Sequence, residues 1–152
     1  MELTPVDKSM LLMLGQLLAT CAMAGIIWMV QIVTYPQFLE VPQSGFLKYH
    51  DRYMKRMSWV VGPVMVAELI FAILGVWYFW DSEIHWHIVT AGLLVPAVWM
   101  VTFFVQVPQH ASLAESGWNE TTVREIIKVN WIRVFIWTAR VGVLLVAFLK
   151  IC

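Results

Sequence analysis

The stretch that decides the fold is VREIIKVNWIRVFIWTARVGVLLVAFLK, residues 123–150. It is long enough to cross a bilayer as a helix, yet it carries Asn130, Arg133 and Arg140. With Trp137 these residues lie at spacings of three, seven and ten from Asn130, so all four share one helix face. A guanidinium group that faces hydrocarbon costs roughly 2.5 kcal/mol or more. This face is therefore expected to contact other helices or a hydrated cavity.

The composition of the whole chain is that of a membrane protein. Of its 152 residues 61% are hydrophobic, against about 45–50% in soluble domains, and only 13% are charged. Ten basic and ten acidic residues balance, and no basic patch is interleaved with aromatic residues, so we expect no nucleic-acid partner. Cys21 and Cys152 are too few and too far apart to predict a disulfide framework or a CxxC metal site.

Four hydrophobic segments predict four membrane-spanning helices in a single domain, residues 1–152. The spans lie at about residues 8–35, 59–80, 86–107 and 123–150. Thr4 and Asp7 form a helix start signal before the first span. Pro36 and Pro108 are expected to end the first and third spans, with a polar loop at residues 111–121. Thr122 is expected to open the last helix through a capping box.

The connection between the first two spans contains an amphipathic helix. Its inner face carries aromatic and apolar residues: Phe46, His50, Tyr53 and Met57. Its outer face carries charged residues: Lys48, Asp51, Arg52 and Lys55. This pattern is typical of a helix that lies in the membrane interface. The predicted fold class is therefore an all-α integral membrane four-helix bundle with one interfacial amphipathic helix between spans 1 and 2.

The distribution of cations predicts the orientation in the membrane. The loops after the first and third spans, with the residues flanking them, carry six cations: Lys48, Arg52, Lys55, Arg56, Arg124 and Lys128. The opposite side carries two, Lys8 and Lys150. The positive-inside rule then places both loops in the cytoplasm and both termini outside, in the inner (plasma) membrane of a cell.

The depths of two charged residues in their spans predict that they form an ion pair. Glu68 lies about 15 Å below the cytoplasmic start of its span, and Arg140 lies about 15 Å from the other surface. Both are therefore near the midplane of a hydrocarbon core about 30 Å thick. Glu68 is the one acid near the middle of a span, which predicts a buried Glu68–Arg140 ion pair, with Arg133 as the rival partner.

A second polar layer is expected nearer the cytoplasmic face. It combines residues from the first, third and fourth spans and both loops: Gln31, Tyr35, His50, Gln106, His110, Asn130, Arg133 and Trp137. In an enzyme that acts on a small apolar molecule, His50 or His110 would serve as base and Arg133 would stabilise an oxyanion. The other five residues would then line the pocket of the substrate.

Other interpretations of the polar layer stay open at this point. The amides can simply hydrogen-bond between helices, at about 0.6 kcal/mol each. The chain can be an accessory subunit of a larger membrane complex or a homo-oligomer, or it can carry protons or ions past Glu68 and Arg140. No cofactor is predicted, and haem or a metal held by His50 and His110 is a minority alternative. Membrane lipid is expected around the bundle.

Two groups of motifs carry a resemblance to known sequences. The first is VQIVTYPQF at residues 30–38, followed by Tyr49-His50, Arg56, WVVGP at residues 59–63, and Glu68. The second is QVPQH at residues 106–110, followed by NWIR at residues 130–133, Trp137 and Arg140. Over about residues 25–145 the chain resembles a family of small uncharacterised bacterial four-helix membrane proteins. It is more distantly similar to anthrone-oxygenase-like membrane proteins, which implies cofactor-independent oxidation of polyphenolic substrates.

Overall fold

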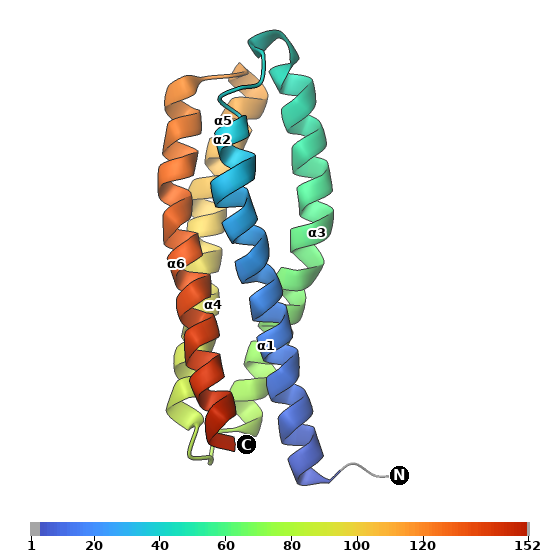
Figure 1. The fold of residues 1–152 in the computed structure, drawn as a ribbon, viewed down its shortest axis with the longest axis vertical. Helices are drawn as coiled ribbons and strands as arrows, with labels where there is room; N and C mark the ends of the chain where they lie inside the picture. Colours follow the sequence, from blue (N-terminus) through green and yellow to red (C-terminus); the bar gives the residue numbers. More distant parts are fainter. Residues whose placement is uncertain (1–3, 152) are drawn as a thin grey trace.

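The computed structural model describes residues 4–151 as a bundle of four long helical rods, with no strand among these residues (Figure 1). The first rod comprises α1 (Pro5–Met29), the π-helix η1 (Val30–Thr34) and α2 (Tyr35–Gln37). The second is α3 (Gln43–Tyr78). The third comprises α4 (His85–Val101), the π-helix η2 (Thr102–Gln106) and α5 (Val107–Ser116). The fourth is α6 (Glu120–Ile151). Each rod is long and apolar enough to cross a membrane, which confirms the predicted fold class.

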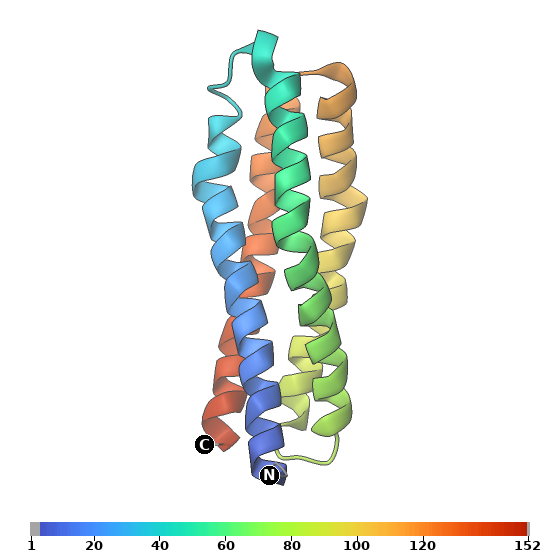
Figure 2. The same cartoon turned by 90° about the vertical axis from the view of Figure 1, so that its right-hand side faces the viewer.

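The rods run antiparallel, so the connections alternate between the two ends of the bundle. The described chain starts and finishes at one end, and the connections after α2 and after α5 lie at the other (Figures 1 and 2). Helix α6 packs against α1 and α4, and α3 packs against the same two helices from the opposite side. The polar stripe of α6 is therefore enclosed by the other rods, as its composition predicts.

The prediction that Pro36 and Pro108 end their helices was wrong. Each proline instead lies in the first turn of a further helical segment, where the missing N–H costs little. A π-helical segment precedes each one, and its wider spacing is seen in the bond from the Tyr35 N–H to the Val30 carbonyl. The helix therefore continues to Gln37 in the first rod and to Ser116 in the third, through much of the predicted loop.

The predicted interfacial helix is present, but it is not a separate element. Its residues form the first turns of α3, which continues without a break into the second span, and Pro63 lies inside this helix. No glycine or proline interrupts the chain between Phe46 and Trp59, so nothing separates the two segments. Phe46 and His50 are buried on its inner face, and Lys48 is exposed, as predicted.

The helix starts follow the expected capping chemistry, with one shift. Thr4 and Asp7 form a reciprocal capping box at the start of α1, as predicted. Helix α6 begins one turn earlier than expected, because the Oδ1 atom of Asn119 accepts the N–H of Thr122 at 3.0 Å. Asn119 is therefore the cap, and the predicted role of Thr122 was wrong.

The core of the bundle has two chemically different halves. The half near the termini is closed by a purely apolar cluster: Met13, Phe79, Ile84, Ile88, Ala91, Leu144 and Ala147. The other half is built around aromatic side chains and contains the buried polar groups of η1, η2 and α6. Any site in the interior therefore lies toward the end where α2, α3 and α5 meet.

Candidate functional site

Glu68 and Arg140 form an ion pair at the centre of the bundle. The Nη1 atom of Arg140 lies 2.6 Å from Oε1 of Glu68, and neither side chain is exposed. This confirms the pairing predicted from helix depth. Trp137 donates its indole N–H to the same carboxylate at 3.0 Å, and the hydroxyl of Thr20 contacts both charges. Because these groups come from α1, α3 and α6, the pair ties three helices together.

Arg140 also contacts the third rod. Its Nε–H donates to the carbonyl of Ala91 on α4 at 2.9 Å. The partners of this pair are all supplied by the chain, so its charges balance without a ligand. A buried pair whose charges balance within the protein is typical of a structural element, although Nη2 of Arg140 has no hydrogen-bond partner.

A chain of amides connects α1 to the second arginine of the stripe. The Nε2 atom of Gln31 donates to the Ile127 carbonyl at 3.2 Å, and Gln31 Oε1 accepts from Asn130 at 2.8 Å. Asn130 Oδ1 then accepts from Nη1 of Arg133 at 3.2 Å. Every group in this chain donates in the same direction, so the chain holds the Arg133 guanidinium at one position.

Arg133 differs from Arg140 because it lacks an acidic partner. Within residues 4–151, no ion pair involves Arg133, and its Nε atom has no hydrogen-bond partner. Its guanidinium lies 5.3 Å from the ring centroid of Trp137, a cation–π contact, and the residue is only 6% exposed. A fixed, buried and unpaired cation of this kind is suited to an anionic group of a ligand.

A second chain of hydrogen bonds joins two histidines and a tyrosine. His50 Nε2 lies 3.0 Å from His110 Nδ1, and His110 Nε2 lies 3.1 Å from the hydroxyl of Tyr35. The same hydroxyl lies 3.4 Å from Oε1 of Gln106, whose Nε2 donates to the Ile126 carbonyl at 3.3 Å. Each imidazole can donate from one nitrogen and accept at the other, so the chain can carry a proton in either direction.

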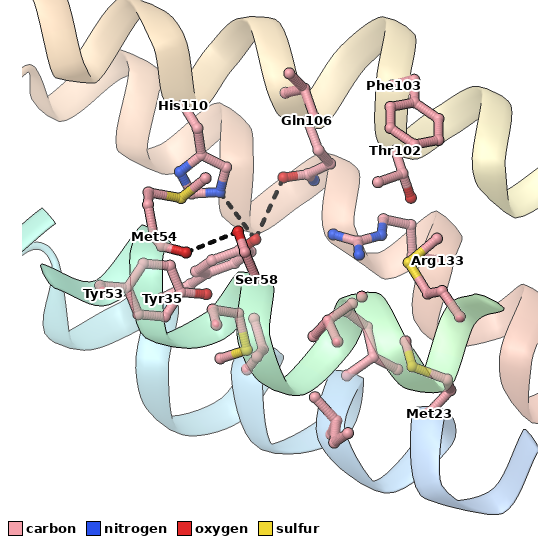
Figure 3. A pocket seen from close by; sticks show the side chains of 18 residues that line it. Met23, Tyr35, Tyr53, Met54, Ser58, Thr102, Phe103, Gln106, His110 and Arg133 are labelled. Atoms are coloured by element: carbon pink, nitrogen blue, oxygen red, sulfur yellow. Dashed lines mark hydrogen bonds between the residues drawn. The ribbon is translucent and has the colours of Figure 1, made fainter. Parts of the chain in front are cut away.

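A cavity of about 230 Å³ lies between these groups (Figure 3). Polar groups at one end are Tyr35, Tyr53, Gln106, His110 and Arg133. The remaining wall is largely apolar and includes Met23, Ile26, Ile27, Val30, Met57, Val61 and Met65. In Figure 3 the guanidinium of Arg133 points toward the space beside Tyr35 and Gln106. An apolar cavity with a few converging polar groups is the usual composition of a small-molecule site.

The cavity reaches the membrane-facing surface between α3 and the third rod. Ser58 from α3, with Phe103 and Val107 from the third rod, line the cavity and are exposed. Among the described residues, α3 contacts α4 and α5 but not the intervening η2. A molecule dissolved in the bilayer can therefore reach the cavity through this opening.

The predicted site residues divide into three groups in the structure. His110, Arg133, Tyr35 and Gln106 line the cavity. Gln31, Asn130 and Trp137 lie behind it and hold Arg133. His50 also lies behind the cavity, hydrogen-bonded to His110 and stacked on Phe46.

Several residues that line the cavity were not predicted from the sequence. They are chiefly Met23, Tyr53, Met54, Met57, Ser58 and Thr102. Tyr53 and Met57 share the inner face of the amphipathic segment with His50, so their helical spacing could have indicated them. No such signal existed for Met23, which resembles other apolar residues of the first span.

The histidines have few further metal ligands near them. Within residues 4–151, no group of three His, Cys, Asp or Glu side chains could hold a metal ion. His50 and His110 instead use one ring nitrogen each to bond to one another. The described side chains therefore offer at most this histidine pair to a metal or haem.

The comparisons with known proteins add no assignment: no family model matches the chain, and neither a curated protein nor a solved structure is significantly similar to it.

Proposed function

We propose that the protein is a membrane enzyme that binds a small apolar molecule with an ionisable hydroxyl group and activates it by removing the proton. The single observation that carries this proposal is the guanidinium of Arg133, which has no acidic partner, at the wall of a largely apolar cavity. A buried cation without an acid is costly in a bilayer, and an oxyanion of a ligand would offset that cost.

The histidine chain supports the second half of the proposal. The hydroxyl proton would pass to the Tyr35–His110 pair, and His110 would pass a proton from Nδ1 to Nε2 of His50. The proton thereby leaves the cavity while Arg133 stabilises the remaining oxyanion. This order agrees with the resemblance to anthrone-oxygenase-like proteins, since a phenolate gives up an electron to O2 more readily than the neutral phenol does.

The orientation is part of the proposal. The six cations beside the α2–α3 and α5–α6 connections favour a cytoplasmic position for that end of the bundle and an external position for the termini. His50 would then lie at the cytoplasmic end of the bundle, toward which the relay would release the proton. The proposed location is the inner (plasma) membrane of a bacterial cell.

Two other functions have less support. A proton or ion pathway would need polar groups through both halves of the bundle. The hydrogen-bonded polar groups lie in one half, and the other half contains the apolar cluster around Met13, Phe79 and Leu144. An accessory subunit could use an apolar groove of about 620 Å³ on the lipid-facing side of α3 and α4. The internal cavity beside Arg133 favours the enzyme, because a purely docking subunit does not need one.

The proposal is tested by comparing 2-naphthol with its methyl ether, 2-methoxynaphthalene, as probes. Both are apolar and similar in shape, but only 2-naphthol can form an anion. Protein purified in mild detergent is titrated by equilibrium dialysis against matched empty micelles. We expect at least about tenfold tighter binding of 2-naphthol, because a hydrogen bond to a charged group contributes about 1.5–3 kcal/mol. The bound probe should show the longer-wavelength absorption band of the naphtholate.

Variants of α6 make this test specific. Arg133→Leu should bind both probes equally, and Phe135→Leu, on the lipid-facing side of the same helix, should keep the preference. Equal binding of both probes by the unmodified protein, or a preference that survives in Arg133→Leu, would overturn the proposal. An absorption spectrum and metal analysis of the same sample test the haem or metal alternative.

A further inference from the structure

A second cavity lies on the outside of the bundle, in a groove between α1 and the first half of α3. Its volume is about 400 Å³. One end is lined by Tyr49, Arg52 and Arg56, and the other by the apolar side chains of Ile26, Met29 and Val60. Ile26, Tyr53 and Met57 form the wall between this groove and the inner cavity. None of His50, His110 and Arg133 lines the groove, so its occupant is separate from the proposed substrate.

The two arginines at the groove have no acidic partner. The exposed cations Lys55 and Arg124 are each paired with an acid one turn away, Asp51 and Glu120 respectively. Among the ion pairs of the described chain, none involves Arg52 or Arg56. They are four residues apart on α3, and like charges at this spacing repel each other. An anion between them would remove that repulsion.

The depth of the groove matches a lipid headgroup. From Tyr78 at the far end of α3 to Arg56, the helix rises about 33 Å at 1.5 Å per residue. This is close to the thickness of the hydrocarbon core of a bilayer, about 30 Å. Trp59 lies one turn below Arg56 and is 82% exposed, as is typical of an aromatic belt residue at the interface. Arg52 and Arg56 therefore lie at the level of phosphate groups, and Ile26, Met29 and Val60 lie toward the acyl chains.

We propose that this α1–α3 groove is a binding site for one anionic phospholipid, with the phosphate between Arg52 and Arg56 and an acyl chain along Ile26, Met29 and Val60. Guanidinium groups bind phosphate oxygens in a bidentate manner, which suits them to this position. The apolar half of the groove selects a lipid rather than a free anion, because inorganic phosphate gains nothing from that surface. The occupant faces the leaflet that borders the α2–α3 and α5–α6 connections.

Native mass spectrometry of the full chain tests the site, with phosphatidylglycerol and phosphatidylcholine of identical acyl chains as probes. We expect one phosphatidylglycerol to be retained at least about fivefold more than phosphatidylcholine. The double variant Arg52→Gln/Arg56→Gln should lose that preference. Lys48→Gln/Lys128→Gln removes the same charge from the same end of the bundle but outside the groove, and should keep it.

A second variant tests the apolar half without changing any charge. Val60→Trp should fill the groove and lower retention of phosphatidylglycerol at least about threefold. Val60 is exposed to 52%, so the larger side chain is accommodated without disturbing the core. Equal retention of the two lipids, an equal loss in both charge variants, or full retention in Val60→Trp would each overturn the proposal.

Discussion

Glu68 on α3 and Arg140 on α6 form an ion pair of 2.6 Å from which both water and lipid are excluded. Trp137 and Thr20 contact the same carboxylate, and the Ala91 carbonyl accepts from the guanidinium. The cluster thereby fixes α1, α3, α4 and α6 relative to one another, and its Trp137 lies one turn from Arg133, whose guanidinium is 5.3 Å from the Trp137 ring centroid. The site is thus built on a rigid support.

Glu68→Gln is expected to destabilise the bundle strongly. The substitution leaves Arg140 buried without a counter-charge, and removal of one partner from a buried pair costs roughly 3 kcal/mol or more. Thermal unfolding in detergent measures the loss. Gln16→Leu is the control, since both polar atoms of the Gln16 side chain are buried without a partner, and its melting temperature should stay equal or rise. Equal melting temperatures for the two variants would contradict the role of the pair.

The two buried arginines of α6, Arg133 and Arg140, should respond differently to the same substitution. Arg140→Leu leaves the Glu68 carboxylate buried and uncompensated, so we expect loss of folded protein. Arg133→Leu leaves no acid behind and should keep the melting temperature within a few degrees while abolishing activity and the preference for 2-naphthol. Size-exclusion profiles and melting curves of both variants provide the measurement. Unfolding of Arg133→Leu would show that Arg133 serves the fold instead.

Much of the fold followed from periodicity and depth. The stripe of Asn130, Arg133, Trp137 and Arg140 was visible because a helix repeats every 3.6 residues. Helix rise and the scarcity of acids in the spans together favoured Arg140 over Arg133 as the partner of Glu68. The rule that a proline ends a helix gave the wrong prediction at Pro36 and Pro108. A proline normally ends a helix, and whether a π-helical segment lets the chain continue depends on packing that a single segment does not encode.

The internal geometry of the site was the least predictable part. His50 and His110 were both expected in the polar layer, but their direct contact depends on how α3 and α5 rotate about their axes. The same holds for Asn130, which was expected to touch the substrate and instead positions Arg133. Sequence spacing identifies the face on which a residue lies, whereas its partner on another helix is fixed by tertiary packing.

Asn130→Leu is expected to weaken binding of 2-naphthol several-fold through Arg133. The guanidinium would lose the hydrogen bond from its Nη1 atom to Asn130 Oδ1, and with it the link to Gln31. A double-mutant cycle separates this effect from a direct contact. In the Arg133→Leu background, Asn130→Leu should change binding no further, because residues that act as a unit are non-additive. Additive losses would mean that Asn130 contacts the ligand itself.

His50→Phe should lower turnover without lowering affinity. His50 lies outside the cavity and, in the proposed relay, receives the proton from His110, so its loss would block proton release and leave the cavity lining intact. We expect a roughly 100-fold lower kcat, the lower end of general acid–base effects, with 2-naphthol binding within about twofold of the unmodified protein. Oxygen uptake with a polyphenolic substrate measures turnover. His110→Phe is the comparison and should lose both. A proportional loss of affinity and turnover in His50→Phe would remove the relay from the mechanism.

Gly75→Ala is expected to destabilise the contact between α1 and α3. A Cβ atom at this position would lie 3.0 Å from Cδ of the buried Gln16 side chain, and closer still to its Nε2. Overpacking of this kind typically costs about 1–3 kcal/mol. The matched control is Gly142→Ala, where a Cβ meets no atom within 4 Å and alanine stabilises the helix by about 1 kcal/mol. Gln16→Ala in the Gly75→Ala background should restore the melting temperature, because it removes the side chain that clashes. A failure of that second substitution to restore stability would show that the clash with Gln16 is not the source of the cost of Gly75→Ala.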